Sequence, residues 1–151
     1  MVTVYDVPPE RLIDEVSNKL KEKNEIVEPD WAPFVKTGMH KEKAPLQAHW
    51  WYTRVSAVFR SVYLEGPVGI SKLRGKYGGA QDNGSKPYHA VKGSGSIVRT
   101  ALKQLEDAGL VVKEDNKGRA VTPEGRSLLD NTAYEVMKDM AKEDPELSKY
   151  L

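Results

Sequence analysis

The chain has 151 residues, 39% of them hydrophobic, which is enough to fill the core of one domain. It has no cysteine, which excludes disulfides and cysteine-based metal or redox sites. Its apolar runs are too short to cross a membrane, and its first residues lack the pattern of a secretory signal. We therefore expect a cytoplasmic protein with a single domain over residues 1–151.

The net charge of +1 conceals an uneven distribution along the chain. Residues 1–35 carry four Lys or Arg and eight Asp or Glu, residues 36–103 carry twelve and three, and residues 104–151 carry seven and eleven. The net charges are therefore −4, +9 and −4. A basic middle between acidic ends favours a surface that binds a polyanion, although a run of charges can also merely solvate a surface.

The N-terminal third predicts one amphipathic helix and an irregular stretch. Pro8 and Pro9 indicate the start of the helix, and apolar residues recur at helical spacing to about Lys23. Trp31 and Phe34 follow in a proline-rich stretch that permits one short helical turn, and we expect both to pack against the core. The next residues, KTGMHKEKAP, form a basic loop.

Residues 46–64 contain no Gly or Pro, and their apolar side chains recur every three or four residues, which predicts a helix. Most of the remaining circumference is also apolar, so we expect this helix to be central and packed on several sides. It nevertheless carries Arg54 and Arg60, whose guanidinium groups are costly to bury alone. These side chains either pair with carboxylates or reach phosphates.

Eight of the twelve glycines lie between residues 65 and 96. Residues 68–78 predict a turn and one short helix with Ile70, Leu73 and Tyr77 facing inward. The rest, residues 79–95, is too polar and too rich in turn formers to bury itself, so we expect a long loop that is functional or disordered.

The C-terminal third predicts a helix, a hairpin and a second helix. Ser94-Gly95-Ser96 opens a helix that is capped by a serine and ends at Gly109, and the β-prone segments 110–112 and 119–121 flank a turn. Thr122 and a following proline then open the last helix, which leaves residues 144–151 as a tail that can fray.

This order of elements is typical of a winged helix-turn-helix, in which the helix before the hairpin is the recognition helix and the hairpin is the wing. The predicted fold class is mainly α: a winged helix-turn-helix-like helical domain with a central helix and a short β-hairpin wing. Such domains bind DNA, RNA or other proteins, so the fold alone does not decide the function.

Signatures of enzymes are missing from the sequence. The GxG at residues 93–95 lacks the third glycine of a dinucleotide-binding motif, and no GxxxxGK[ST] motif is present. His40, His49 and His89 are too scattered to indicate a zinc site, and no spacing indicates a catalytic triad. We expect no catalytic residue, metal ion, cofactor or small-molecule substrate.

Several segments together resemble one family. WWYTRVSAVFRSVYLEGPVGISKLRGKYGG, DNGSKPYHAVKGSGSIVRTALKQLEDAGLV and GRAVTPEGRSLLD are similar to the archaeal and eukaryotic-type small-subunit ribosomal proteins called "S nineteen e". DVPPERLIDEV and EPDWAPFVKTGMHKEKAP resemble the same family, whereas the tail DPELSKYL matches no motif of it. The resemblance implies a non-catalytic protein that binds ribosomal RNA in the head of the small subunit. It also implies neighbouring ribosomal proteins as partners and a need for the protein in late maturation of the small-subunit RNA.

The predicted RNA-binding residues come from the basic middle of the chain. Arg binds phosphate through two hydrogen bonds and stacks on bases, Lys supplies a mobile charge, and aromatic rings stack on bases. The resemblance marks four of them, Trp50, Arg54, Arg60 and Arg99, as positions of the family's motif. The full set is Trp50, Arg54, Arg60, Lys72, Arg74, Lys76, Lys86, Tyr88, His89, Lys92, Ser94, Ser96, Arg99 and Lys103.

A winged-helix DNA-binding transcriptional regulator is the alternative. Such a protein should concentrate positive charge on its recognition helix and wing. Residues 96–108, however, hold only Arg99 and Lys103 against Glu106 and Asp107. Most of the positive charge lies earlier in the chain, which favours an RNA-binding scaffold. We expect the free protein to be a monomer.

Overall fold

Five α-helices and two β-hairpins make up the computed structural model, which describes all residues 1–151. The α-helices are α1 (Pro9–Lys21), α2 (Trp50–Glu65), α3 (Ile70–Lys76), α4 (Gly95–Asp107) and α5 (Pro123–Glu143). The strands are β1 (Gly79–Asn83) and β2 (Lys86–Val91) in one antiparallel hairpin, and β3 (Val111–Glu114) and β4 (Gly118–Val121) in the other. Short 3-10 helices occupy Val4–Asp6, Ala32–Phe34 and Pro145–Tyr150.

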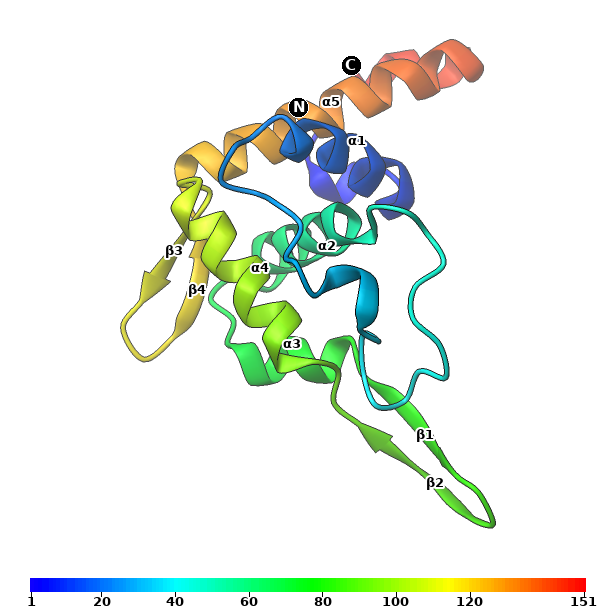
Figure 1. The fold of residues 1–151 in the computed structure, drawn as a ribbon. Helices are drawn as coiled ribbons and strands as arrows, with labels where there is room; N and C mark the ends of the chain where they lie inside the picture. Colours follow the sequence, from blue (N-terminus) through cyan, green and yellow to red (C-terminus); the bar gives the residue numbers. More distant parts are fainter.

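Helix α2 lies at the centre of the molecule, with α1 and α5 on one side and α3 on the other (Figure 1). It packs against α1, α4 and β4, and its side chains Trp51, Val55 and Phe59 are fully buried. The prediction of a mainly helical domain around a central helix is therefore confirmed. No helix combines the length and the apolar character needed to cross a bilayer.

The start of α2 differs from the prediction. The helix begins at Trp50 rather than at residue 46, because His49 adopts a left-handed backbone with φ of 56°. Leu46 consequently lies outside the helix and is 96% exposed. A His49 ring nitrogen lies 3.1 Å from Glu28 Oε1, which holds this turn against the preceding segment.

The winged-helix order is present from α2 onward. Helices α3 and α4 follow α2, and β3 and β4 form the wing. Val68 pairs with the wing through two backbone hydrogen bonds to Arg119, of 2.9 and 2.8 Å. The Arg119 side chain also forms an ion pair of 2.9 Å with Glu106 on α4, so the wing is fixed to the recognition helix.

Side-chain caps fix two predicted helix starts. The Ser94 hydroxyl accepts a hydrogen bond from the Ile97 N–H at the start of α4, and the Thr122 hydroxyl accepts one from the Gly125 N–H at the start of α5. Helix α4 ends before Gly109, whose φ of 77° suits glycine. These local signals are why the C-terminal half matches its prediction closely.

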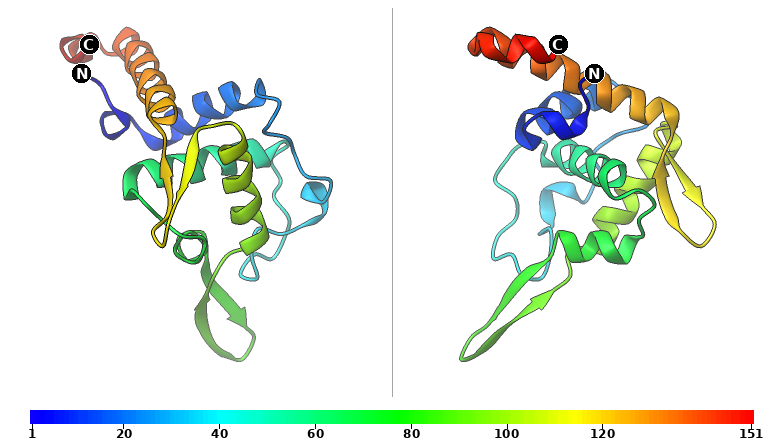
Figure 2. Two further views of the ribbon diagram at one scale, coloured as in Figure 1. Left: turned by 90° about the vertical axis from the view of Figure 1, so that its left-hand side faces the viewer. Right: turned by 180° about the vertical axis from the view of Figure 1, so that it is seen from behind.

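The predicted long loop at residues 79–95 is wrong. It is a two-stranded hairpin that projects from the body at the end opposite to α5 (Figures 1 and 2). The turn contains Gly84, with φ of 73°, whose N–H donates to Asp82 Oδ1 at 2.8 Å. Because almost all side chains of β2 are exposed, the sequence lacks the alternation of apolar and polar residues that usually indicates a strand.

The structure differs from the prediction at Phe34 and at the C-terminal tail, and it agrees at Trp31. Trp31 packs edge-on against Trp51 with ring centroids 5.7 Å apart, as expected for a core contact. Phe34 is 84% exposed, because the 3-10 turn that contains it directs its ring away from the core. The tail, for which the sequence allowed fraying, forms a 3-10 helix whose first turn is capped by Asp144.

Candidate nucleic-acid interface

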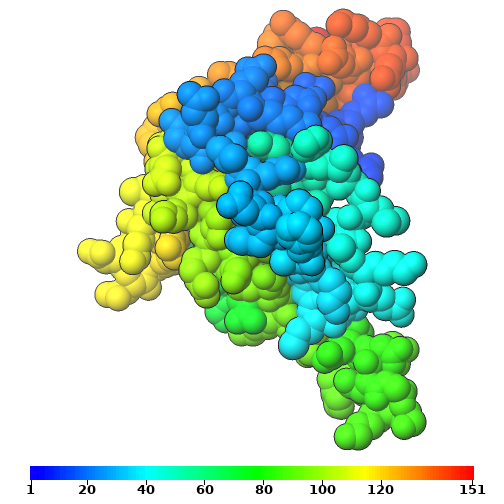
Figure 3. Space-filling view, viewed as in Figure 1, coloured from blue at the N-terminus to red at the C-terminus, as the bar shows by residue number.

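Two pockets lie next to each other where residues 35–47 pass between α2 and the base of the β1–β2 hairpin. We call the pocket against α2 the loop pocket and the one at the hairpin base the hairpin pocket. Neither is lined by an Asp or Glu. Figure 3 shows the 35–47 segment, in cyan, directly above the projecting hairpin.

The loop pocket has a volume of about 540 Å³ and combines cations with aromatic and apolar walls. Lys41 and Lys43 line it from the loop, and Trp50 and Arg54 line it from α2. Trp50 is half-buried and its indole N–H donates to the Ala32 carbonyl at 3.3 Å, so this ring is partly a structural element.

Arg54 lies over an aromatic ring rather than beside a carboxylate. Its guanidinium carbon is 4.4 Å from the centroid of Tyr77, and the side chain makes no hydrogen bond or ion pair within the chain. Burial lowers the pKa of Arg54 and raises that of Tyr77, whose hydroxyl lies 3.1 Å from Ser61 Oγ. Arg54 therefore retains its donors for a ligand in the loop pocket.

Arg60 also lacks an internal partner. Its Nε is buried and without a hydrogen bond, and no carboxylate lies within ion-pair distance. Because Nε is buried, only the terminal nitrogens of the guanidinium group can meet an external acceptor. Of the two alternatives that the sequence left open, pairing with carboxylates is thus excluded for both Arg54 and Arg60.

The hairpin pocket has a volume of about 560 Å³ and is lined by Lys36, Arg74 and Lys92. Arg74 Nε donates to the Gly93 carbonyl at 3.0 Å, which ties α3 to the end of the hairpin. Lys92 Nζ donates to Ser71 Oγ at 2.6 Å, so its charge is held in place but not neutralised.

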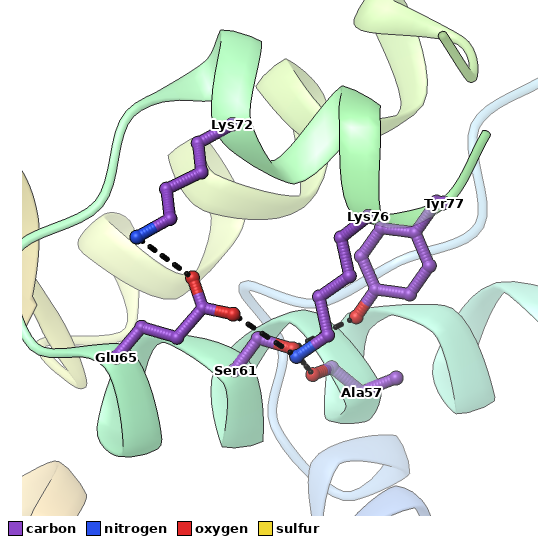
Figure 4. A network of polar contacts seen from close by, with 6 residues as sticks. All are labelled: Ala57, Ser61, Glu65, Lys72, Lys76 and Tyr77. Atoms are coloured by element: carbon purple, nitrogen blue, oxygen red, sulfur yellow. Dashed lines mark hydrogen bonds and ion pairs between the residues drawn. The ribbon is translucent and has the colours of Figure 1, made fainter. Parts of the chain in front are cut away.

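Lys72 and Lys76 differ from the other predicted residues because they share one carboxylate. Lys72 Nζ lies 3.7 Å and Lys76 Nζ 3.3 Å from the oxygens of Glu65 at the end of α2 (Figure 4). The three side chains together carry a single net positive charge. Their contribution to an anion-binding surface is therefore smaller than the sequence suggests.

The start of α4 brings two further cations close to the hairpin pocket. A Cβ atom placed on Gly95 would lie 3.3 Å from the Arg74 side chain and 3.5 Å from Arg99 Nη2, so these guanidinium groups converge there. Lys103 follows Arg99 by one helical turn and is also exposed. Ser96 is exposed in the first turn, whereas the Ser94 hydroxyl is occupied by the helix cap.

Three of the predicted residues that line neither pocket lie on the projecting hairpin. Lys86, Tyr88 and His89 are exposed on β2 along the projecting hairpin, and Tyr88 is 59% exposed. They can meet RNA only along the sides of the hairpin. The structure thus divides most of the predicted set into a pocket group, a Glu65-paired group and a hairpin group. The remaining four residues line neither pocket: Arg60, Ser96, Arg99 and Lys103.

The sequence prediction missed Lys36, Lys41 and Lys43. The basic character of their loop was visible in the sequence, but its position was not. His40 fixes that position, because its ring fills the space between the hairpin base and the loop: a Cβ on Gly38 would lie 2.7 Å, and one on Gly79 2.9 Å, from ring atoms of His40. The Ser94 N–H also donates to the Thr37 carbonyl at 3.0 Å.

No group of three or more His, Asp or Glu side chains converges on a possible metal position. The wing offers little free charge either, because Arg119 is paired with Glu106 and the remaining lysines flank Glu114 and Asp115. The positive surface available to a polyanion is therefore centred on the two pockets and not on the wing.

The sequence of the chain is similar to those of proteins from one family. The family model described as Ribosomal protein S19e matches residues 3–139. Small ribosomal subunit protein eS19 of Thermoplasma volcanium is 50% identical over the full length of both chains, and that of Aeropyrum pernix is 49% identical, also over the full length of both. Small ribosomal subunit protein eS19B of Schizosaccharomyces pombe is 38% identical over 91% of this chain and 96% of its own. The chain therefore belongs to the ribosomal protein S19e family.

Proposed function

We propose that this protein is a structural constituent of the small ribosomal subunit that binds small-subunit ribosomal RNA. The relatives named above are small ribosomal subunit proteins, and they align with this chain from end to end. The protein has no catalytic role in this proposal. It holds folded RNA in one arrangement and so supports late maturation of the small-subunit RNA.

One observation carries the proposal: six cations line two adjoining pockets that contain no carboxylate. Folded RNA presents closely spaced phosphates, and a surface of this kind can bind them through shape and charge without reading a sequence. The six residues are Lys36, Lys41, Lys43, Arg54, Arg74 and Lys92.

The opposite end of the molecule suits protein neighbours rather than RNA. Helices α1 and α5 meet there, and the groove between them is lined by Asp14, Glu15, Asp139 and Glu143. Acidic side chains repel phosphate, so this end should face basic ribosomal proteins or solvent.

A salt titration of RNA binding tests the proposal. Each phosphate contact contributes about 0.7–0.9 to the slope of log K against log salt concentration. The double variant Lys41→Gln, Lys43→Gln should therefore reduce that slope by about 1–2 for a fragment of small-subunit RNA. Fluorescence anisotropy at several salt concentrations provides the measurement.

Lys113→Gln on the wing is the matched control, since it removes one exposed lysine from outside both pockets. It should leave the slope unchanged. The reverse pattern, with the wing variant weakening binding and the loop variant having no effect, would point instead to the DNA-binding alternative.

A further inference from the structure

We propose that the loop pocket accepts a single unpaired nucleotide of the RNA, with the base against Trp50 and Arg54 and the phosphate near Lys41 and Lys43. This inference rests on the proposed RNA-binding function and makes it more specific. The hairpin pocket and the exposed lysines bind phosphates of paired RNA. The loop pocket distinguishes RNA that presents an extruded base from fully paired RNA.

The walls of the loop pocket are the first reason. A site for phosphate alone needs only cations, yet here Pro45, Leu46 and Trp50 face the pocket together with the cations. Its volume of about 540 Å³ lies within the range of about 300–1,000 Å³ typical of small-molecule sites. A base that remains in a duplex cannot enter such a recess, whereas an unpaired base can leave its stack and place its flat face against these walls.

Arg54 is the second reason. The guanidinium carbon lies 4.4 Å from the centroid of the Tyr77 ring, and this cation–π contact restrains the group before any ligand arrives. The side chain has five N–H donors and makes no hydrogen bond within the chain. A guanidinium plane held in this way can stack on a base and donate to its edge or to a phosphate at the same time.

The charge around the mouth of the loop pocket is the third reason. Lys41 and Lys43 are exposed and form no ion pair, and Glu42 between them does not line the pocket. Helix α2, sixteen residues long, starts beside the pocket without a side-chain cap, so no side chain bonds the N–H groups of its first turn. A phosphate at the mouth would meet both sources of positive charge.

The hairpin pocket provides an internal contrast. It has a similar volume, about 560 Å³, but no aromatic side chain lines it, and only Val35 and Met39 are hydrophobic. It can therefore bind phosphate without distinguishing paired from unpaired RNA. Only the loop pocket combines the two chemistries that a nucleotide requires.

The test compares two RNAs with the free full-length protein: a short duplex, and the same duplex carrying one bulged nucleotide. We expect the bulged RNA to bind about tenfold more tightly, as one stacked base allows. In NMR spectra it should shift the Trp50 indole N–H and the Arg54 Nε–H signals, which the plain duplex should leave in place. Equal affinities and unshifted Trp50 and Arg54 signals would overturn the proposal.

Variants separate filling of the pocket from loss of charge. Thr53→Leu adds volume to the wall of the loop pocket but removes no cation, so it should abolish the preference for the bulge and leave duplex affinity unchanged. Lys86→Gln on the hairpin is the control, and it should reduce the affinity for both RNAs by the same factor. If Thr53→Leu leaves the preference intact, the base does not occupy this pocket.

Titration with free nucleotides shows whether the pocket binds a nucleotide within RNA or a free mononucleotide. Adenosine and cytidine monophosphates at millimolar concentration should shift the Trp50 signal far less than micromolar bulged RNA, because they lack the other phosphate contacts. Saturation by micromolar mononucleotide would instead indicate a site for free nucleotides and contradict this inference. Failure of both RNAs to bind would contradict the proposed function itself, whereas equal binding of both contradicts only the nucleotide pocket.

Discussion

Arg54 and Arg60 lie on the same helix, but their surroundings give them different roles. Arg54 packs over Tyr77, whereas Arg60 has no partner for its charge. The helical pattern of the sequence placed both on α2, with Arg54 closer to the apolar face and Arg60 the clearer candidate for RNA, but it could not show what Arg54 contacts. The difference depends on Tyr77, which reaches α2 only through the packing of α3, and such a contact leaves no trace in local periodicity.

The substitution Arg60→Glu should impair incorporation into small subunits and leave the isolated fold largely intact. No hydrogen bond or ion pair of the Arg60 guanidinium group is lost, while the reversed charge repels phosphate. Urea unfolding and sedimentation of the variant with small subunits provide the two readouts. Arg54→Glu is the matched comparison and should also reduce the free energy of unfolding, by about 1–3 kcal/mol, because a packed side chain is replaced. Loss of cooperative unfolding in Arg60→Glu would show that Arg60 supports the core.

Tyr63 should make stability depend on pH at the alkaline end. Its hydroxyl donates a 2.8 Å hydrogen bond to Asp130, and burial together with this bond raises the pKa of Tyr63 from 10.0 to about 12. The folded protein therefore holds this proton more tightly than the unfolded chain does. The associated stabilisation is complete below pH 10 and is lost as the pH rises through about 12.

The variant Tyr63→Phe lacks this titrating group and isolates its effect. Between pH 10 and 12, its free energy of unfolding should fall less steeply than that of the unmodified protein. Urea unfolding of both proteins across this interval measures the difference. Parallel pH profiles would show that the hydrogen bond to Asp130 does not favour the protonated phenol.

At the scale of elements, the β1–β2 hairpin was the largest error of the sequence-based prediction. The Asn83-Gly84 pair is a strong hairpin signal, but it is usually recognised between alternating apolar residues. Here the strands are polar on both faces because the hairpin extends into solvent. The caps and the wing, by contrast, follow from local rules at Ser94 and Thr122, and these predictions were confirmed.

Shortening the hairpin should separate stability from RNA binding. Replacing residues 80–90 with a short Gly-Ser link removes no residue of the buried core, so the free energy of unfolding should change by less than about 1 kcal/mol. Affinity for RNA should fall, since Lys86 and Tyr88 are lost. Val111→Ala in the wing is the contrasting variant, since it removes buried atoms and should destabilise more. Unfolding of the shortened protein would show that the hairpin supports the body.

Glu65 links α2 to α3 and limits the charge that α3 presents. Glu65→Gln would release Lys72 and Lys76, which it now holds at 3.7 and 3.3 Å. Because these pairs are near the surface, the cost in stability should be below about 1 kcal/mol. RNA affinity and its salt dependence should both rise, as anisotropy titrations can show. An unchanged affinity would place this part of α3 outside the interface.

At the scale of the whole molecule, charge is segregated between two ends. The groove between α1 and α5, with the Arg11–Glu143 ion pair, carries several acidic side chains. The β1–β2 hairpin projects from the opposite end of the molecule (Figure 2). The charge distribution along the sequence predicted a polyanion-binding face in the middle of the chain. It could not predict that residues 35–47 fold back beside the hairpin base, because that placement depends on His40 and on the backbone contact from Ser94.

The winged-helix order was also predictable, because each of its elements is marked by local periodicity or by a cap. The sequence did not reveal how the wing is used. In a DNA-binding winged helix, a wing arginine would be free to contact DNA. Here Arg119 forms a 2.9 Å ion pair with Glu106, which only the folded structure shows. The wing therefore serves here to stabilise the domain more than to supply charge.

Sedimentation of a cell extract tests the central claim most directly. The protein should migrate with small ribosomal subunits at low salt and be released only at high salt, since its phosphate contacts exchange with counterions. Recovery of the protein wholly in the soluble fraction at low salt, bound to a defined DNA sequence, would contradict a role in the small subunit.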